Sequence, residues 1–185
     1  MLERAVIVHA SPTLARLKLG SLFNIVRGET FDDELEHLNA LFEPKGLVLT
    51  VLRQRGGRAL MYLYRTGELE RALECRRIRG FLGTCGYENF DLESVIAHLR
   101  SRLESCEEFP HEIGVFLGYP LSDVIGFIEN EGRDCLCCGC WKVYSNECEA
   151  LRTFARFSKC KEVYGRLFAS GRPLSKLTVC SRAAC

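Results

Sequence analysis

The side chains best suited to chemistry gather in one segment, residues 109–144. This segment holds four closely spaced thiols, a histidine, a lysine and the only Trp of the chain. Thiolates and imidazoles bind metals, imidazoles transfer protons near neutral pH, and indoles stack on ligands. We therefore expect the functional site here. No complete set of nucleophile, base and orienting group can be assembled from the segment, so whether the protein is an enzyme stays open.

Three residues of this segment are candidates for acid–base catalysis or anion binding: His111, Glu112 and Lys142. His111 and Glu112 precede the apolar run 113–117, which we interpret as a buried strand, and sites are often built where loops meet strands. Lys142 lies in a second predicted strand, 141–144. If the two strands are neighbours, the three side chains converge on an anionic ligand. The alternative is that His111 caps a turn and that Glu112 pairs with Lys142 or an arginine.

Aromatic and polar neighbours are expected to line the same pocket. The predicted ligand-binding residues are His9, Tyr119, Trp141 and Tyr144. His9 belongs to the polar stretch 9–13, which we interpret as a turn that either reaches the pocket or satisfies itself. We expect His111→Ala to abolish ligand binding without unfolding the protein.

The cysteines favour a second class of function, a metal-binding or redox-linked protein. Cys135 and Cys138 have the C-x-x-C spacing that places two thiolates on one Zn or Fe ion. A closed tetrahedral site needs two more ligands, for which the candidates are Cys160, Cys180 and Cys185. The alternative is that the thiols pack as small apolar side chains. Because the motif precedes a predicted strand and no helix, thioredoxin-like redox chemistry is not expected.

A third class of function is a protein-interaction module. Exposed aromatic residues anchor many interfaces, and Trp141 and Tyr119 are the candidates here. The partner is then another protein, whereas the first hypothesis requires an unknown small molecule.

Composition limits the remaining possibilities. A chain of 185 residues, 47% hydrophobic and 26% charged, is typical of one globular domain. Its net charge of +1 argues against nucleic-acid binding. The N-terminal apolar run 5–8 is too short for a signal peptide or a membrane span, so we expect a cytoplasmic protein without a membrane partner. Eleven cysteines in that compartment indicate free thiols or metal ligands, and an odd number cannot all pair.

The elements that must position these residues alternate between helix and strand. The clearest signal is a β-hairpin, in which the apolar runs 47–52 and 59–64 flank Gly56 and Gly57. Helical spacing or a helix-start signal predicts further elements, which we place at 2–8, 31–42, 67–79, 91–103 and 121–128, with a first strand at 17–25. A long last helix, capped by Ser145, carries an apolar face from Cys148 to Leu167.

These elements predict an α+β fold, with a central mixed sheet that includes the hairpin and is packed by several helices. The hairpin excludes an all-parallel sheet. Residues 1–179 are expected to form a single domain, and residues 180–185 a flexible tail that carries two cysteines.

Three blocks of sequence resemble a family of bacterial proteins, from anaerobes, that is known as a domain of unknown function. The blocks are HxSPTLA at 9–15, PHEIGxFLGYPxxDVxGF at 110–127 and GxWKVY at 139–144. The resemblance extends over residues 1–179 and implies a small single-domain cytosolic protein, with no particular activity. The chain departs from the family pattern at Arg16, where glycine is expected, and at Cys140, where an aromatic residue is expected.

Overall fold

Two antiparallel strands joined by a glycine turn form the centre of the fold, as the sequence predicts. The computed structural model describes residues 1–105 and 109–181. Strands β2 (Leu47–Arg55) and β3 (Arg58–Arg65) meet at Gly56 and Gly57, whose φ angles of 56° and 73° suit a tight hairpin turn. Strand β1 (Gly20–Val26) pairs with the other edge of β3, which gives the order β1-β3-β2. The α+β prediction is confirmed, and this sheet is antiparallel throughout.

The central strand β3 contributes to two separate hydrophobic cores. Successive side chains of a strand point to opposite faces, and here both faces are covered. Ala59, Met61 and Leu63 belong to one core, and Leu60, Tyr62 and Tyr64 belong to the other. The sheet is therefore the middle layer of the molecule.

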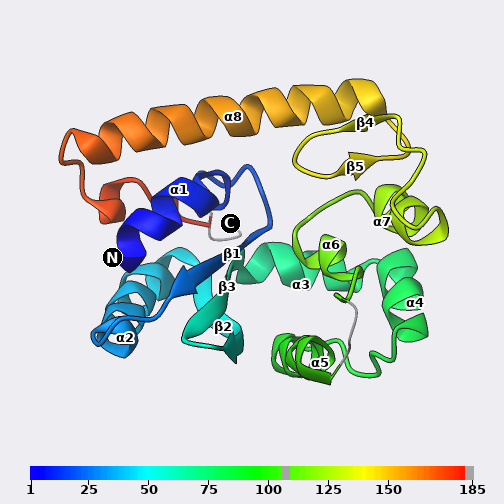
Figure 1. Ribbon diagram of the computed structural model, residues 1–185, viewed down its shortest axis with the longest axis horizontal. Helices are drawn as coiled ribbons and strands as arrows, with labels where there is room; N and C mark the ends of the chain where they lie inside the picture. Colours follow the sequence, from blue (N-terminus) through cyan, green and yellow to red (C-terminus); the bar gives the residue numbers. More distant parts are fainter. Residues whose placement is uncertain (106–108, 182–185) are drawn as a thin grey trace.

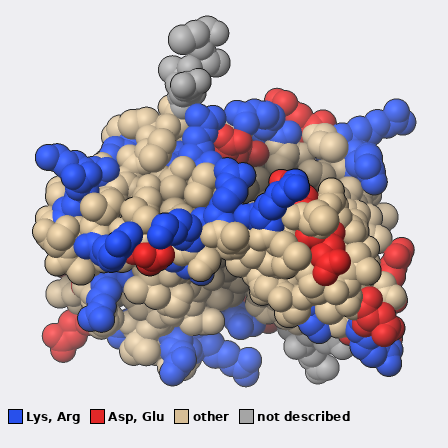
Figure 2. Space-filling view, turned by 90° about the horizontal axis from the view of Figure 1, so that it is seen from above, with Lys and Arg blue, Asp and Glu red and all other residues tan. Residues whose placement is uncertain are grey.

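One face of the sheet is covered by α1 (Leu2–Leu14) and α2 (Phe31–Phe42), and α8 (Glu147–Ala169) lies along the outer side of α1 (Figure 1). Two single-turn 3-10 helices, Glu43–Lys45 and Leu174–Lys176, complete this side. Figure 2 shows Lys and Arg side chains gathered across the middle of the face on which α8 lies.

The other core is formed mainly by short helices. They are α3 (Thr66–Glu74), α4 (Arg76–Thr84), α5 (Leu92–Ser105), α6 (Ile113–Phe116) and α7 (Leu121–Glu129). A small hairpin of β4 (Cys137–Cys138) and β5 (Lys142–Val143) then connects α7 to the start of α8 (Figure 1). This hairpin, which belongs to the segment 109–144, thus lies between α7 and the first turns of α8.

The apolar run 113–117 is a short helix, α6, so our prediction of a buried strand there is wrong. A short apolar run that is buried on every side has no period that separates strand from helix. In α6 all four residues are buried, and a Cβ on Gly114 would lie 2.7 Å from Val124 of α7. Because Gly114 has no side chain, this helical turn can pack closely against Val124 of α7.

Two other predicted boundaries are also wrong. Residues 9–13 are not a turn, because α1 continues through Pro12 to Leu14. Burial of Val6, Ala10 and Leu14 along one face of α1 outweighs the proline, which lies in the last turn. The predicted helix 67–79 is two helices, which meet at Cys75, a residue with an extended ψ of 118°.

The described C-terminal residues are tied to the body of the protein. Arg65, fully buried, donates from its guanidinium to the carbonyl oxygens of Thr13, Leu14 and Val179 at 2.7–2.8 Å. The N–H of Ser181 bonds to the Lys45 carbonyl at 3.0 Å. The predicted tail therefore begins in a hydrogen-bonded stretch, and its residues 182–185 lie outside the described part. Within the described ranges, no helix has the length and apolar character needed to cross a membrane.

Candidate functional site

A cavity of about 280 Å³ lies between α6, α7 and the β4–β5 hairpin. Its lining is mostly apolar. Four aromatic rings from three separate stretches of chain belong to it, those of Phe109, Tyr119, Phe127 and Trp141. Two basic side chains, His111 and Lys142, also line it. Of the predicted site residues, His111, Tyr119, Trp141 and Lys142 therefore share one cavity.

Asp123 holds the hairpin wall of this cavity in place. Its carboxylate is 2% exposed and accepts three hydrogen bonds. Oδ2 accepts from the indole N–H of Trp141 at 2.8 Å, and Oδ1 accepts from the Tyr144 N–H at 2.9 Å and the Ser145 hydroxyl at 2.6 Å. Charge-assisted bonds of this kind are stronger than neutral ones. The carboxylate thereby joins the first turn of α7 to the strand that carries Lys142.

Ser145 is consequently not the cap of α8 that we predicted. Its hydroxyl donates to Asp123, and the cap is Asn146, whose side-chain oxygen accepts from the Glu149 N–H at 3.2 Å. Both residue types cap helices well, so only the competing contact with Asp123 decides between the two neighbours.

The indole of Trp141 is clamped between two other rings. It stacks on Tyr119, with ring centroids 4.9 Å apart, and meets Phe154 of α8 edge to face at 4.5 Å. Such offset and edge contacts are the favourable geometries for aromatic pairs. Gly139 makes the clamp possible, because a Cβ at this position would overlap the Phe154 ring. Trp141 and Tyr119 are both half-buried in this arrangement.

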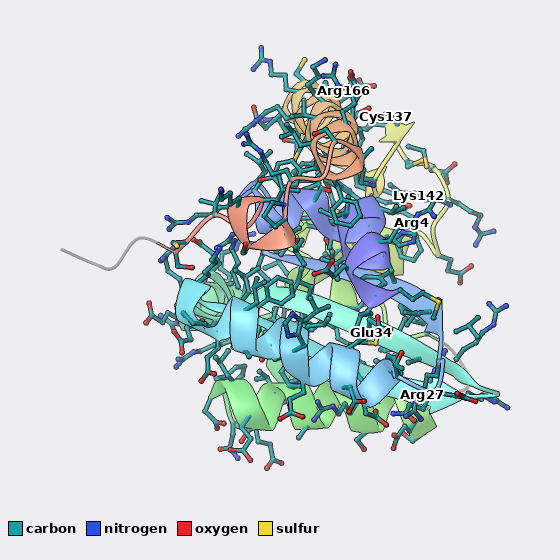
Figure 3. All side chains as sticks on the ribbon, turned by 90° about the vertical axis from the view of Figure 1, so that its left-hand side faces the viewer. Arg4, Arg27, Glu34, Cys137, Lys142 and Arg166 are labelled. Atoms are coloured by element: carbon teal, nitrogen blue, oxygen red, sulfur yellow. The ribbon has the colours of Figure 1, made fainter. Side chains whose placement is uncertain are left out.

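His111 and Lys142 both lie near one ring of the cavity wall, that of Phe127. The imidazole of His111 meets this ring edge to face at 4.8 Å, and Lys142 Nζ lies 5.8 Å from the ring centroid. Lys142 also donates to the Gly132 carbonyl at 2.6 Å. Figure 3 labels Lys142 on the small hairpin, together with Cys137. His111 is exposed and Lys142 is half-buried, so both basic groups can be reached from solvent.

The other predicted site residues lie elsewhere. Glu112 is buried away from the cavity, where it accepts hydrogen bonds from Arg102 at 2.8 and 3.3 Å; this ion pair is one of the alternatives that the sequence left open. Tyr144 is half-buried, and its hydroxyl is buried with no hydrogen-bond partner in the described part of the chain. His9 stacks on Phe23 at 5.5 Å and lines a different cavity.

The predicted metal ligands that the structure describes do not form a cluster of three or more. Among the described residues, no group of three or more His, Cys, Asp or Glu side chains is placed to hold a metal ion. Cys138 pairs with Lys142 across the small hairpin and lines the cavity, and Cys135 is half-buried next to that hairpin. Cys160 is buried in α8, where burial raises the pKa of its thiol to about 11. Cys185 lies outside the described residues.

The sequence did not identify Asp123, Phe109, Phe127 or Gly139 as parts of this site. Asp123 in the first turn of a helix is typical of a residue that complements the helix dipole, and that pattern hid its role. Its partners lie 18 to 22 residues further along the chain, a separation that no helix or strand period predicts. Phe127 follows the apolar period of its helix and looks like any core residue.

Comparison with known proteins gives a family. Residues 6–178 match the family described as protein of unknown function (DUF3793), and the chain belongs to that family. No curated protein matches the chain. No solved structure matches it either. Arg16, where the resemblance led us to expect glycine, has a φ of 59°, in the left-handed region that glycine adopts most readily.

Proposed function

We propose that this member of the DUF3793 family binds a small aromatic anion in the cavity between α6, α7 and the β4–β5 hairpin. The observation that carries the proposal is an apolar, ring-lined cavity with two basic side chains at its wall. Binding sites for small molecules are commonly apolar concavities with a few polar groups that fix orientation. Here the rings provide the apolar surface, and His111 and Lys142 provide the polar groups.

The charges at the cavity favour an anion. The one carboxylate in its described lining, Asp123, already accepts three hydrogen bonds, so it is committed to the protein. Lys142 uses one of its three N–H donors on the Gly132 carbonyl, and no ion pair joins it to a carboxylate among the described residues. Two donors of an ammonium group are thus left for a ligand.

The size and shape of the cavity favour a single ring. A volume of about 280 Å³ is at the lower end of the range for ligand pockets. One aromatic ring with a short acidic side chain fits this volume, and its face can pack against Trp141 or Phe127. Phenylacetate has this chemistry and serves as a probe, whereas 2-phenylethanol has the same skeleton without the charge.

The test uses Trp141 as a built-in reporter, because it is the only Trp of the chain and lines the cavity. We expect phenylacetate to change the Trp emission in a saturable manner and 2-phenylethanol to bind about tenfold more weakly, as the loss of a charge-assisted bond requires. The proposal fails if neither compound produces a saturable change, or if both bind equally well.

Two variants locate the anion within the cavity. Lys142→Met and His111→Ala should each raise the Kd for phenylacetate about tenfold, with an unchanged far-UV circular dichroism spectrum. Lys176→Met, which removes an exposed charge in the distant Leu174–Lys176 turn, is the matched control and should leave the Kd unchanged. An equal loss of affinity in the control would assign the effect to net charge rather than to the cavity.

We also propose a cytoplasmic location. Eleven cysteines, an odd number, suit a reducing compartment better than an oxidising one. A metal-binding role for Cys135 and Cys138 stays a prediction, and metal analysis of protein purified without oxygen tests it.

A further inference from the structure

A second cavity, of about 210 Å³, lies where α1, α8 and the loop after α1 meet. Three basic side chains from these three stretches line it: His9, Lys18 and Lys161. None of its described lining residues is Asp or Glu. We propose that this cavity is a second binding site, for a phosphate group, either free or carried by a small phosphorylated molecule. It shares Tyr119 with the aromatic cavity, but its basic groups would bind phosphate whether or not that cavity binds an aromatic anion.

In the part of the chain that the structure describes, the basic groups of this cavity have no acidic partners. Within the described ranges, neither Lys18 nor Lys161 forms an ion pair with a carboxylate. Lys18 Nζ instead lies 5.1 Å from the centroid of the Tyr119 ring. Like charges placed together without a counter-ion disfavour each other, and an anion between them removes that cost. Phosphate carries about 1.5 to 2 negative charges at pH 7 and several acceptor oxygens, which matches three basic groups that line one space.

The charges and the burial around Lys18 agree with an anion-binding site. Burial and, to a smaller extent, the charge of Lys161 together lower the pKa of its ammonium group to about 8, although the Cys140 thiol acts in the opposite direction. On its other side Lys18 borders a space that is also lined by Arg16 and Glu68. The Glu68 carboxylate is bonded to Arg16 at 2.9 Å and Arg71 at 2.6 Å, so it is already neutralised.

The surface outside the cavity adds long-range attraction for anions. Lys and Arg gather on the face formed by α8, the helix that contributes Lys161 (Figure 2). Four of the basic residues of α8 lie at helical spacing on its outer side: Arg152, Arg156, Lys159 and Arg166. Figure 3 labels Arg166 on this outer side. Arg152, Lys159 and Arg166 pair with Glu149 or Glu162 of the same helix, so the attraction that this face adds for anions is modest.

The test is calorimetric titration at pH 7 and low salt with two probes, inorganic phosphate and glycerol 3-phosphate. Saturable binding of either probe supports the site, and a preference between them tells a free phosphate from a phosphorylated molecule. Lys18→Met and Lys161→Met should each weaken binding at least about tenfold. Lys159→Met removes the same charge from the outer side of α8, where it is paired with Glu162 at 3.0 Å, and should weaken binding by less than about twofold.

Stability and pH provide readouts that a structural role for Lys18 would not give. Lys18→Met should raise the Tm of the unliganded protein, because it removes a half-buried charge that has no ion-pair partner among the described residues. The affinity for sulfate, whose charge is constant in this range, should fall as pH rises from 7 to 9 and Lys18 loses its proton. The proposal is overturned if the wild-type protein binds neither phosphate probe at millimolar concentration, or if Lys159→Met weakens binding as much as Lys18→Met.

Discussion

The indole N–H of Trp141 donates a 2.8 Å hydrogen bond to Oδ2 of Asp123, a residue 18 positions earlier in the chain. The other carboxylate oxygen accepts from Tyr144 and Ser145, on the far side of β5. One buried side chain of α7 therefore fixes both ends of the strand that carries Lys142. The geometry of the proposed aromatic-anion site depends on this carboxylate, although it does not contact the anion in our account.

Replacement of Asp123 should test that dependence. Asp123→Ala leaves the Trp141 and Tyr144 N–H groups without their acceptor, and the free energy of unfolding should fall by about 2–3 kcal/mol. Urea unfolding measures this loss, and the Trp141 emission should shift to the red as water reaches the indole. Glu129→Ala, an exposed position in the same helix, is the control and should change stability by less than about 0.5 kcal/mol. Equal stability of the two variants would contradict the assigned role.

Two glycines should respond in opposite directions to the same change. Gly139→Ala places a methyl group against the Phe154 ring, so we expect a loss of about 1–3 kcal/mol and weaker binding of phenylacetate. Gly165 lies inside α8 with open space around it, and Gly165→Ala should stabilise the protein by about 0.5–1 kcal/mol. Thermal unfolding of both variants should show a lower Tm for Gly139→Ala and a higher Tm for Gly165→Ala. A Gly139→Ala variant with wild-type stability and affinity would contradict the close contact between Gly139 and the Phe154 ring.

Local patterns predicted the parts of the fold whose signals are local. The hairpin follows from Gly56 and Gly57 between two apolar runs, and α2 follows from its helical period. The strand predicted at 113–117 is wrong because a run that is buried on every side shows no polar–apolar period. The turn predicted at 9–13 is wrong because the core packing of α1 outweighs the effect of Pro12. Of the residues predicted for one pocket, His111, Lys142, Tyr119 and Trp141 line the same cavity, whereas His9, Glu112 and Tyr144 do not. The roles of Asp123 and Phe127 depend on contacts between distant segments, which a single sequence does not encode in any spacing.

The junction between the N-terminus and α2 should make stability depend on acidic pH. The Leu2 N–H, the N-terminal ammonium and the Thr30 hydroxyl lower the pKa of the Glu34 carboxyl from 4.5 to about 2. Figure 3 labels Glu34 on this helix. Because the folded pKa is the lower one, the stabilisation is complete above pH 4.5 and is lost as pH falls towards 2.

Glu34→Gln should therefore reduce the free energy of unfolding at pH 7 by about 1 kcal/mol, a modest value because the carboxylate is partly exposed. The difference from the wild type should shrink between pH 4.5 and pH 2. Urea unfolding at pH 7, 5 and 3.5 measures it, with Glu36→Gln, exposed in the same helix, as the control. A difference that does not change with pH would show that Glu34 contributes packing rather than charge.

An NMR titration of labelled protein with phenylacetate tests directly whether the aromatic cavity binds an aromatic anion. The single indole N–H signal, that of Trp141, and the methyl signals of Ile113 and Val124 report on the aromatic cavity. The methyl signals of Val6 and Leu38 report on the core at the other face of the sheet. We predict saturable shifts of the first set with one common Kd, while the second set stays in place. Shifts confined to the second set, or no saturable shift of the indole signal, would contradict the proposed function.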